Sequence, residues 1–466
     1  MNASEATLPG SRTRRGVSSR RRRASRCVRF CRLYSEVAYL FRHALLRDAA
    51  YQLQLPGDRA RLHGLAFAVL EELAGGRAPE FGWRARSGEP ARATHPSDPS
   101  AAEMAAHARD AMSFGTANAG DLLAAQRLYW RRAAAWAEER FKDAEAESCW
   151  SACAAVEQAE RKAEALRCAG QAAERSGKAR EAEPMYEEAL SIFRSQGDRG
   201  GEGSTLCNLG RLLLESGRVE SSERSYRQAI AIHREIRDRR GESLDLTGLA
   251  RLHAFTGRLE EAERGFEESL AIDRALDHRR GEAVNLSDLS VLYVDTGRVD
   301  LALSAGERAL ALLREIGDRR MEGVTLGNLA SLYKETGRLE ESARAFEHAL
   351  ALHREIGNRR SEGVTLGNMA RRILQDGRCA EAETLFTQAL AIHREVGNLR
   401  FEAAHSCDYA ICVLALGRRS AASSVWRRGA AALQALGDTA ELGFKREEML
   451  DACAKAGVPP FPERAD

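Results

Sequence analysis

A strict 40-residue period runs through most of this 466-residue chain and constrains its fold more than any other feature. One glycine recurs at the same place in each period: Gly177, Gly217, Gly257, Gly297, Gly337, Gly377 and Gly417. A glutamate repeats with the same spacing: Glu202, Glu242, Glu282, Glu322, Glu362 and Glu402. Such a period predicts a repeat protein, in which each unit buries its apolar faces against its neighbours.

The unit that contains Gly337 shows how one period is expected to fold. Apolar residues recur at helical spacing over residues 324–333, and Gly337 is placed to end that helix in a left-handed conformation. A second apolar stripe covers residues 339–356, where Gly357 ends the second helix. Each unit is therefore predicted to be an antiparallel pair of helices, here called helix A and helix B, and the array to be all-α.

The order of residue types within the unit resembles the tetratricopeptide repeat. Helix A of that family carries large apolar, Leu, small and aromatic residues before a Gly, and helix B carries small, aromatic and small residues. The matching residues here are Leu326, Leu329, Ala330, Tyr333, Gly337, Ser342, Phe346 and Ala349. The unit length is similar to that in kinesin light chains and bacterial maltose-regulator-like proteins. The resemblance implies a right-handed superhelical solenoid, although Gly306 and Trp426 replace the aromatic of helix B.

Residues 39–63, YLFRHALLRDAAYQLQLPGDRARLH, resemble a helical segment that follows the nucleotide-binding module of large bacterial signalling ATPases. The resemblance rests on matched residues at both ends of this segment: Phe41, Arg42, His43, Ala44, Leu45, Asp48, Ala49, Ala50, Tyr51, Leu55, Pro56, Arg59, Leu62 and His63. No G-x-x-x-x-G-K-[ST] phosphate loop occurs in the sequence. We therefore expect a relative of those proteins that lacks the ATPase core and ATPase activity.

Composition divides the chain into six parts. Residues 1–35 hold ten arginines and one acidic residue and are predicted to be a basic disordered tail. The next parts are a helical segment at 36–75, a Pro-, Gly- and Ser-containing linker at 76–100, and degenerate helical repeats at 101–160. Seven repeats follow at 161–440, and 441–466 is expected to hold a capping helix and a tail.

The basic stretch at 11–32 can attract phosphates by charge alone. However, residues 11–26 have no interleaved aromatic side chains on which bases could stack. We interpret the stretch as a solvated tail, with attachment to nucleic acid or an anionic membrane as the alternative. Neither nucleic acid nor a membrane is the expected partner.

The polar residues do not form a motif for catalysis or metal binding. The ten cysteines include no C-x-x-C pair. His233, His353 and His393 share one repeat position, but Asp273 and Leu313 interrupt the series. Equivalent atoms of neighbouring repeats are expected to lie about 10 Å apart, too far for one ion. We therefore predict no enzyme, no metal and no cofactor. Unpaired thiols, and the absence of an apolar run of about 18–20 residues, favour a cytoplasmic protein.

The tetratricopeptide resemblance also implies where a ligand binds. In that family helix A lines a concave groove, and asparagines in kinesin light chains hold the backbone of an extended peptide there. In successive units the position just before Leu329 holds Asn208, Gly248, Asp288, Asn328, Asn368 and Asp408. Within a few residues after this position, several units carry an arginine or a lysine. The implied peptide-binding set is Asn208, Arg211, Arg251, Asn328, Lys334, Asn368 and Arg371, with an acidic peptide as one option. The alternative is that the asparagines bridge neighbouring repeats.

The paired arginines before each helix A, such as Arg319 and Arg320, have two interpretations. They form local ion pairs with the glutamate of the first turn, or they form a ladder that binds acidic ligands.

The predicted function is protein–protein interaction, by a bacterial scaffold or sensor that binds a partner peptide or protein in the concave groove. The alternative is the regulatory C-terminal remnant of a bacterial signalling ATPase or transcriptional regulator, whose nucleotide-binding core lies on another chain.

Overall fold

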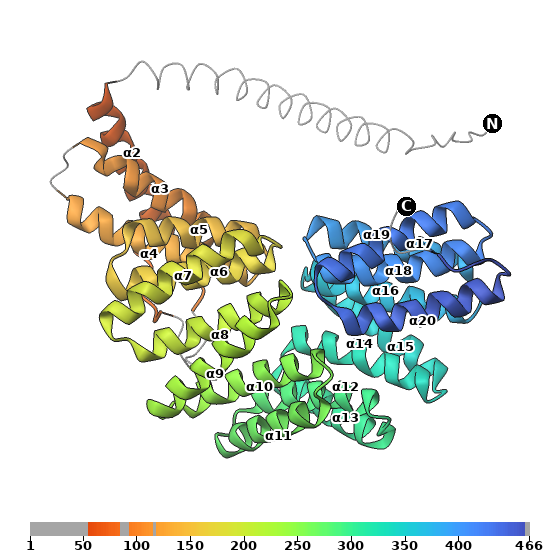
Figure 1. Ribbon diagram of the computed structural model, residues 1–466. Helices are drawn as coiled ribbons and strands as arrows, with labels where there is room; N and C mark the ends of the chain where they lie inside the picture. The colour runs from red at the N-terminus through yellow and green to blue at the C-terminus, as the bar shows by residue number, and fades with distance from the viewer. Residues whose placement is uncertain (1–54, 84–92, 115–117, 462–466) are drawn as a thin grey trace, which may run out of the picture. The chain divides into compact units, whose positions relative to one another are not determined.

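The structure is a computed structural model that describes residues 55–83, 93–114 and 118–461 (Figure 1). These ranges contain α-helices and short 3-10 helices and no strand, so the all-α prediction is confirmed. The elements before the repeats are α2 (Pro56–Leu73), 3-10 helices at Asp98–Ser100 and Met112–Phe114, α3 (Ala101–Ala111), α4 (Ala119–Glu138) and α5 (Asp143–Val156). The basic tail and most of the ATPase-like segment lie outside the described residues.

The chain divides into two compact units. The described part of the smaller unit, residues 55–70, 106–114 and 118–123, brings α2 to the end of α3, where Nδ1 of His63 lies 2.7 Å from Nδ1 of His107. The larger comprises residues 71–105 and 124–466 and contains every repeat.

Several described residues of the predicted linker 76–100 contact α4. The guanidinium of Arg132 is buried, donates to Oδ1 of Asp98 at 2.7 Å, and also donates to two backbone carbonyls of this segment. Arg131, its neighbour on α4, is paired with Glu80. These linker residues are therefore fixed by specific polar contacts in the larger unit.

Seven antiparallel helix pairs follow at the predicted spacing. Their A helices are α6 (Ala159–Arg175), α8 (Arg199–Glu215), α10 (Arg239–Phe255), α12 (Arg279–Asp295), α14 (Arg319–Glu335), α16 (Arg359–Gln375) and α18 (Leu399–Ala415). Their B helices are α7 (Ala179–Gln196), α9 (Val219–Glu235), α11 (Leu259–Ala275), α13 (Val299–Ile316), α15 (Leu339–Glu355), α17 (Cys379–Glu395) and α19 (Arg419–Ala435). A single helix, α20 (Thr439–Lys455), continues the series in an A position.

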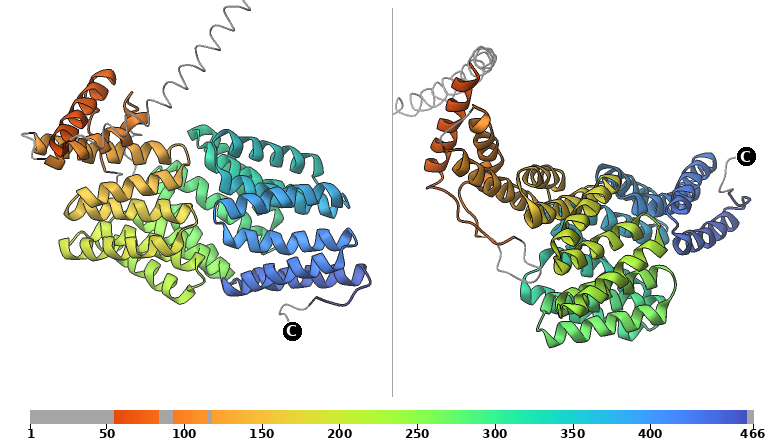
Figure 2. Two further views of the ribbon diagram at one scale, coloured as in Figure 1. Left: turned by 90° about the horizontal axis from the view of Figure 1, so that it is seen from above. Right: turned by 60° about the vertical axis from the view of Figure 1, so that its left-hand side comes forward.

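The stacking of the pairs determines the curvature of the array. Each A helix packs on the next A helix, whereas successive B helices in the described ranges are not in comparable contact. The A side of the stack is therefore the tighter side, and the helices of the larger unit follow one another along an arc (Figures 1 and 2). The array is an all-α solenoid whose A helices line the concave face.

Large side chains of the B helices pack against small residues of the A helices. Tyr226 of α9 lies between Gly210 and Gly248, where an added Cβ would lie 3.1 and 2.3 Å from its ring. At Gly306, which replaces the usual aromatic in α13, an added Cβ would lie 2.7 Å from Leu329 of the next A helix. The glycines of these helices are therefore packing requirements, because a methyl group would displace a large neighbour.

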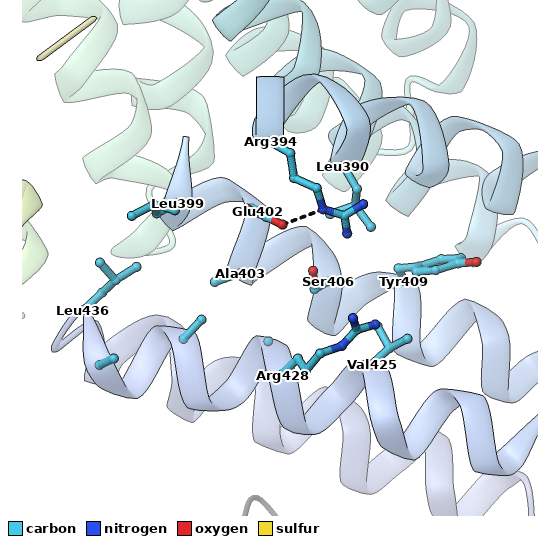
Figure 3. Close-up of a pocket in the computed structure, with 13 residues that line it drawn as sticks. Leu390, Arg394, Leu399, Glu402, Ala403, Ser406, Tyr409, Val425, Arg428 and Leu436 are labelled. Carbon is cyan, nitrogen blue, oxygen red and sulfur yellow. Dashed lines mark hydrogen bonds and ion pairs between the residues drawn. The ribbon is translucent and has the colours of Figure 1, made fainter. Parts of the chain in front are cut away.

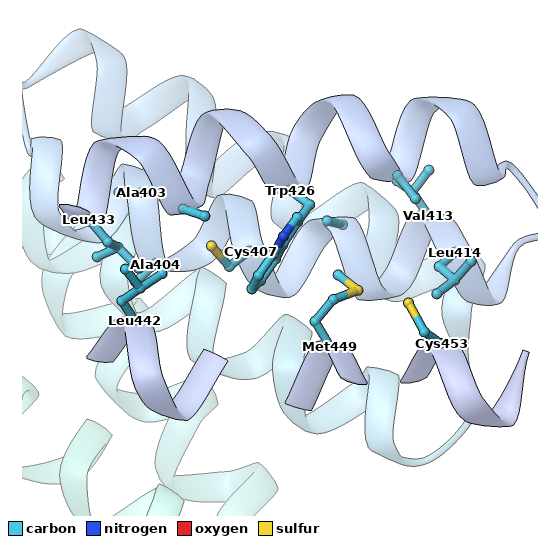
Figure 4. Close-up of a cluster of buried hydrophobic side chains, with 13 residues drawn as sticks. Ala403, Ala404, Cys407, Val413, Leu414, Trp426, Leu433, Leu442, Met449 and Cys453 are labelled. Carbon is cyan, nitrogen blue, oxygen red and sulfur yellow. The ribbon is translucent and has the colours of Figure 1, made fainter. Parts of the chain in front are cut away.

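Helix α20 covers the C-terminal end of the stack. Figure 4 shows Trp426 of α19 in a buried cluster to which α20 contributes Leu442, Met449 and Cys453. All four side chains are at most 3% exposed. The predicted capping helix thus buries one face against the last pair.

The turns that connect helix B to the next helix A need a left-handed residue. Glycine supplies it in most units, with φ between 63° and 72° at Gly197, Gly317, Gly357, Gly397 and Gly437. Two units place Arg237 (φ 58°) and Asp277 (φ 50°) there instead. A residue with a Cβ is strained in this region.

We expect Arg237→Gly to raise the thermal unfolding midpoint. Relief of the left-handed strain stabilises the folded state by about 1–2 kcal/mol. The extra conformational entropy that glycine loses on folding reduces this gain. The Arg237 side chain is exposed and has no ion pair or hydrogen bond with the described residues, so no contact is lost. Calorimetry of the variant against wild type tests this, and a lowered midpoint would contradict it.

Turns that are distant in sequence also meet within the larger unit. A Cβ on Gly177 would lie 2.6 Å from Cα of Gly397, and one on Gly217 would lie 2.3 Å from the carbonyl oxygen of Leu436. The turn after α6 therefore touches the turn after α17, and the turn after α8 touches the turn after α19.

This contact predicts different costs for two similar substitutions. Gly177 (φ 80°) and Gly377 (φ 77°) share the left-handed conformation, but an added Cβ at Gly377 meets no atom within 4 Å. Both alanine variants carry the same conformational cost, and Gly177→Ala must also displace the backbone of the facing turn. We expect Gly177→Ala to lower the urea midpoint further than Gly377→Ala, and equal midpoints would argue against the contact.

Candidate functional site on the concave face

The concave face presents equivalent residues from successive A helices. The three predicted asparagines, Asn208, Asn328 and Asn368, are half-buried on α8, α14 and α16. Because the A helices touch, side chains at this position reach the neighbouring unit. The contacts below show which of them do so.

Two of the three asparagines bridge adjacent repeats. Oδ1 of Asn208 accepts a hydrogen bond from Nε2 of Gln171 at 3.1 Å, and Oδ1 of Asn368 lies 3.4 Å from Nε2 of His405. Asn328 has no side-chain hydrogen bond in the described part of the chain. The bridging alternative therefore accounts for Asn208 and Asn368 but not for Asn328.

The three predicted arginines already have carboxylate partners. Nη2 of Arg211 lies 3.1 Å from Oε2 of Glu174, Nη2 of Arg251 lies 2.8 Å from Oδ2 of Asp288, and Nη2 of Arg371 lies 2.7 Å from Oε1 of Glu448. Glu448, the partner in the last pair, lies on α20, a helix that the sequence analysis did not connect with the groove. A ligand carboxylate must therefore compete with an internal one at each arginine.

Two of these partners share a spacing that sequence analysis could have used. Glu174 precedes Arg211 by 37 residues, and Arg251 precedes Asp288 by 37 residues. A spacing of 37 residues equals one repeat minus about one helical turn. Two side chains with this spacing face each other across the contact between successive A helices. Burial raises the pKa of Asp288, and Arg251 opposes that rise.

Lys334 differs from the arginines because no described carboxylate lies within ion-pair distance. It is half-buried near the end of α14. Burial, and then the positive charge of Arg371, lower its pKa, while Glu335 and Glu448 act in the opposite direction. A partly desolvated ammonium beside a second cation is stabilised by an added anion.

The position of Lys334 is apolar in most of the array. Five other A helices hold an apolar residue there: Leu214, Ala254, Val294, Leu374 and Leu414. The exception is Glu174 of α6, which pairs with Arg211. Lys334 precedes Arg371 by the same spacing, so the fifth unit opposes two cations where the first unit forms an ion pair. This exchange is visible in the aligned repeats, although the sequence analysis did not single it out.

The histidines of the shared repeat position belong to separate local clusters. Nδ1 of His233 lies 2.6 Å from Oδ2 of Asp245, and Nε2 of His393 lies 3.0 Å from Nδ1 of His405. Burial lowers the pKa of His353 to about 4 and that of His393 to about 3. The described ranges contain no group of three or more His, Cys, Asp or Glu side chains that could hold a metal ion.

Most arginines of the repeated pairs form ion pairs within the protein. Arg359 is paired with Glu362 of its own first turn and, at 2.8 Å, with Glu395. The second arginine of a pair has a different partner from the first: Arg280, for example, pairs with Asp318 at 2.7 Å. Local pairing therefore accounts for these residues better than a ladder for acidic ligands.

No helix in the described residues combines the length and apolar character needed to span a bilayer.

Comparison with known proteins identifies the repeats. Residues 161–235, 242–315 and 321–395 match the sequence model of the tetratricopeptide repeat family. A search of curated proteins finds no match.

Several solved structures resemble this chain at low sequence identity. A Rap protein complexed with Competence and Sporulation Factor has a TM-score of 0.56 at 13% identity, over 83% of this chain and 100% of that chain. The Rap conjugation gene regulator of the plasmid pLS20, in complex with the Phr* peptide, has a TM-score of 0.51 at 14% identity, over 62% of this chain and 79% of that chain. A signal transduction ATPase with a tetratricopeptide repeat sensor from Pyrococcus horikoshii has a TM-score of 0.48 at 13% identity, over 75% of this chain and 56% of that chain. At 13–14% identity, the similarity to the two Rap proteins establishes the fold alone.

The unpaired Lys334 leads to a prediction about stability. Its pKa is lower in the folded state than in the unfolded state, so the charged form opposes folding. We expect Lys334→Leu, which installs the residue of the equivalent position 374, to unfold at higher urea than wild type at pH 7. The cost of the charge is full below the folded pKa and disappears as pH rises to the unfolded value of about 10.4. The difference between variant and wild type should therefore shrink toward pH 10.

A control uses an exposed lysine. Lys455→Leu changes the same residue type at a side chain that is 76% exposed, and we expect no comparable gain. A Lys334→Leu variant less stable than wild type at pH 7 would refute the argument.

Proposed function

Residues 161–395 contain tetratricopeptide repeats, and from this premise we propose that the protein is a scaffold or sensor that binds an extended peptide segment of a partner along its concave face. The ligand-binding residues lie mainly on α14 and α16. The ligand presents a carboxylate to Lys334 and exposes backbone groups to the Asn328 amide.

The observation that carries this proposal is the state of Lys334. The other predicted cations are neutralised by Glu174, Asp288 and Glu448. Lys334 lacks such a partner among the described residues and occupies a position that neighbouring units fill with apolar side chains. A half-buried charge that opposes folding is retained more readily when it serves a ligand.

The amides divide into two roles under this proposal. Asn328 is available to donate to a peptide carbonyl and accept from a peptide N–H, as a side-chain amide can do simultaneously. Asn208 and Asn368 would have to leave Gln171 and His405 before binding a ligand. Peptide contacts are therefore expected first at Asn328 and Lys334.

The solved relatives are consistent with a peptide as the ligand class. Two Rap proteins with the same fold are described in complex with Competence and Sporulation Factor and with the Phr* peptide. Extending this ligand class to the present chain is part of the proposal.

The cysteine chemistry supports a binding role over covalent catalysis. Burial raises the pKa of Cys149 to about 11 and that of Cys412 to about 12. Cys207 lies close to Asp245, and burial holds its pKa well above the ordinary value. A thiol must ionise to act as a nucleophile, and these groups stay protonated near neutral pH. Unmodified thiols also fit the reducing cytoplasm that we infer as the location.

The proposal is tested with Lys334→Glu. Glutamate at this position can pair with Arg371 as Glu174 pairs with Arg211, so the variant should fold while reversing the charge that the ligand meets. Peptides are first selected against the wild-type protein from a displayed library of random sequences, then measured by fluorescence anisotropy. We expect Lys334→Glu to weaken binding about tenfold or more, the loss of one charge-assisted contact.

A convex-face variant provides the matched control. Arg344 on α15 has a side chain that is 72% exposed, and Arg344→Glu makes the same reversal of sign away from the A helices. Binding should be unchanged in this control. Failure to select any peptide, or equal affinities for Lys334→Glu and wild type, would overturn the proposed function.

A further inference from the structure

A second candidate site lies between α17, α18 and α19, among residues that the predicted groove does not include. It is a cavity of about 540 Å³ with a largely apolar lining that includes Leu390, Ala403, Val425 and Ala432. Figure 3 shows these elements with Arg394 and Arg428 approaching the cavity from opposite sides. A volume of this size lies within the range of small-molecule sites.

The cavity exists because the last repeat departs from the pattern of the others. The residue equivalent to Ala432 is a buried isoleucine or leucine in five preceding B helices: Ile232, Ile272, Leu312, Leu352 and Ile392. Alanine removes most of that side chain. Gly429, one turn earlier, adds no space, because a Cβ there would lie 2.8 Å from Sγ of Cys407. The space is therefore associated with the substitution at position 432.

The ion pair that lies above the equivalent position in the preceding unit is also missing. In the preceding unit Arg359 pairs with Glu395 at 2.8 Å at the edge of the equivalent surface. The corresponding residues here are Leu399 and Ala435, and both line the cavity. Leu399 is 60% exposed. The ion pair that lies over the filled core of the preceding unit is thus replaced here by apolar residues at the edge of the cavity.

The side chains that line the cavity carry a net charge of one positive unit. Nε of Arg394 lies 2.8 Å from Oε1 of Glu402, so these two neutralise each other. Arg428 is exposed and has no ion pair or hydrogen bond with the described residues, and its equivalent in α17 is the neutral Gln388. Ser406 adds a hydroxyl that faces the same space (Figure 3).

We propose that this cavity binds a small amphipathic monocarboxylate, a molecule with one apolar body and one acid group. The apolar body occupies the volume that Ile392 fills in the preceding unit, beside Val425 and Leu390. The carboxylate pairs with Arg428, whose guanidinium offers two parallel donors to an acid group. This site is separate from the concave face and does not depend on peptide binding there.

The test uses octanoate as the probe, with octylammonium as the probe of opposite charge. Titration calorimetry on the full chain is expected to show saturable binding of octanoate and none of comparable strength for octylammonium. Ala432→Ile restores the side chain of the preceding repeat, fills the cavity and should abolish binding. Arg428→Gln installs the residue of α17 and should weaken octanoate about tenfold.

Ala431→Ile is the matched control, because it adds the same side chain one residue away at an exposed position. It should leave octanoate binding unchanged. Thermal melting of each variant establishes that it is folded before binding is compared. The proposal is overturned if wild type shows no saturable octanoate binding, if Ala432→Ile binds as wild type does, or if octylammonium binds equally well.

Discussion

A helix pair of this sequence has two apolar stripes and can bury only one of them within itself, so each unit depends on the next one for its core. The dependence is visible in single side chains. Tyr226 packs against glycines of both the A helix before it and the A helix after it. Trp426 has no further pair to pack on and is covered by α20 instead. The last helix is therefore part of the core as well as a cap.

The same close packing of A helices determines the electrostatics of the concave face. Helices that touch bring charged side chains from consecutive repeats within reach, which explains why Arg211 and Arg251 find internal carboxylates. The concave face is consequently a set of compensated charges, with Lys334 as the exception among the predicted residues. A ligand carboxylate gains most binding free energy at a cation that has no internal partner. At the other cations it only replaces one ion pair with another.

Both candidate sites arise where the repetition is broken. Lys334 stands where five other units have an apolar residue, and Ala432 stands where five others have isoleucine or leucine. Residues that every unit shares have structural explanations: glycines accommodate a left-handed turn or a neighbouring ring, and the first-turn glutamates pair with arginines. Conversely, most of the paired arginines form ion pairs within the protein, and two of the three asparagines at the position that the family resemblance implies bridge neighbouring repeats. Several described residues of segment 76–100 likewise contact α4, although their composition is that of a linker.

The period, the helix pairs, the glycine turns and the all-α solenoid can be predicted from the sequence, because these follow from local spacing of apolar residues and from backbone conformation. The family resemblance also indicates the face on which a ligand is expected. Which of the candidate side chains are free can be seen in the folded chain alone. That depends on distances between repeats, such as those from Arg371 to Glu448 of α20 and from Asn368 to His405, and a one-dimensional pattern does not contain them. The cavity beside Ala432 has the same origin, since a small residue produces a hollow only when the surrounding helices stay in place around it.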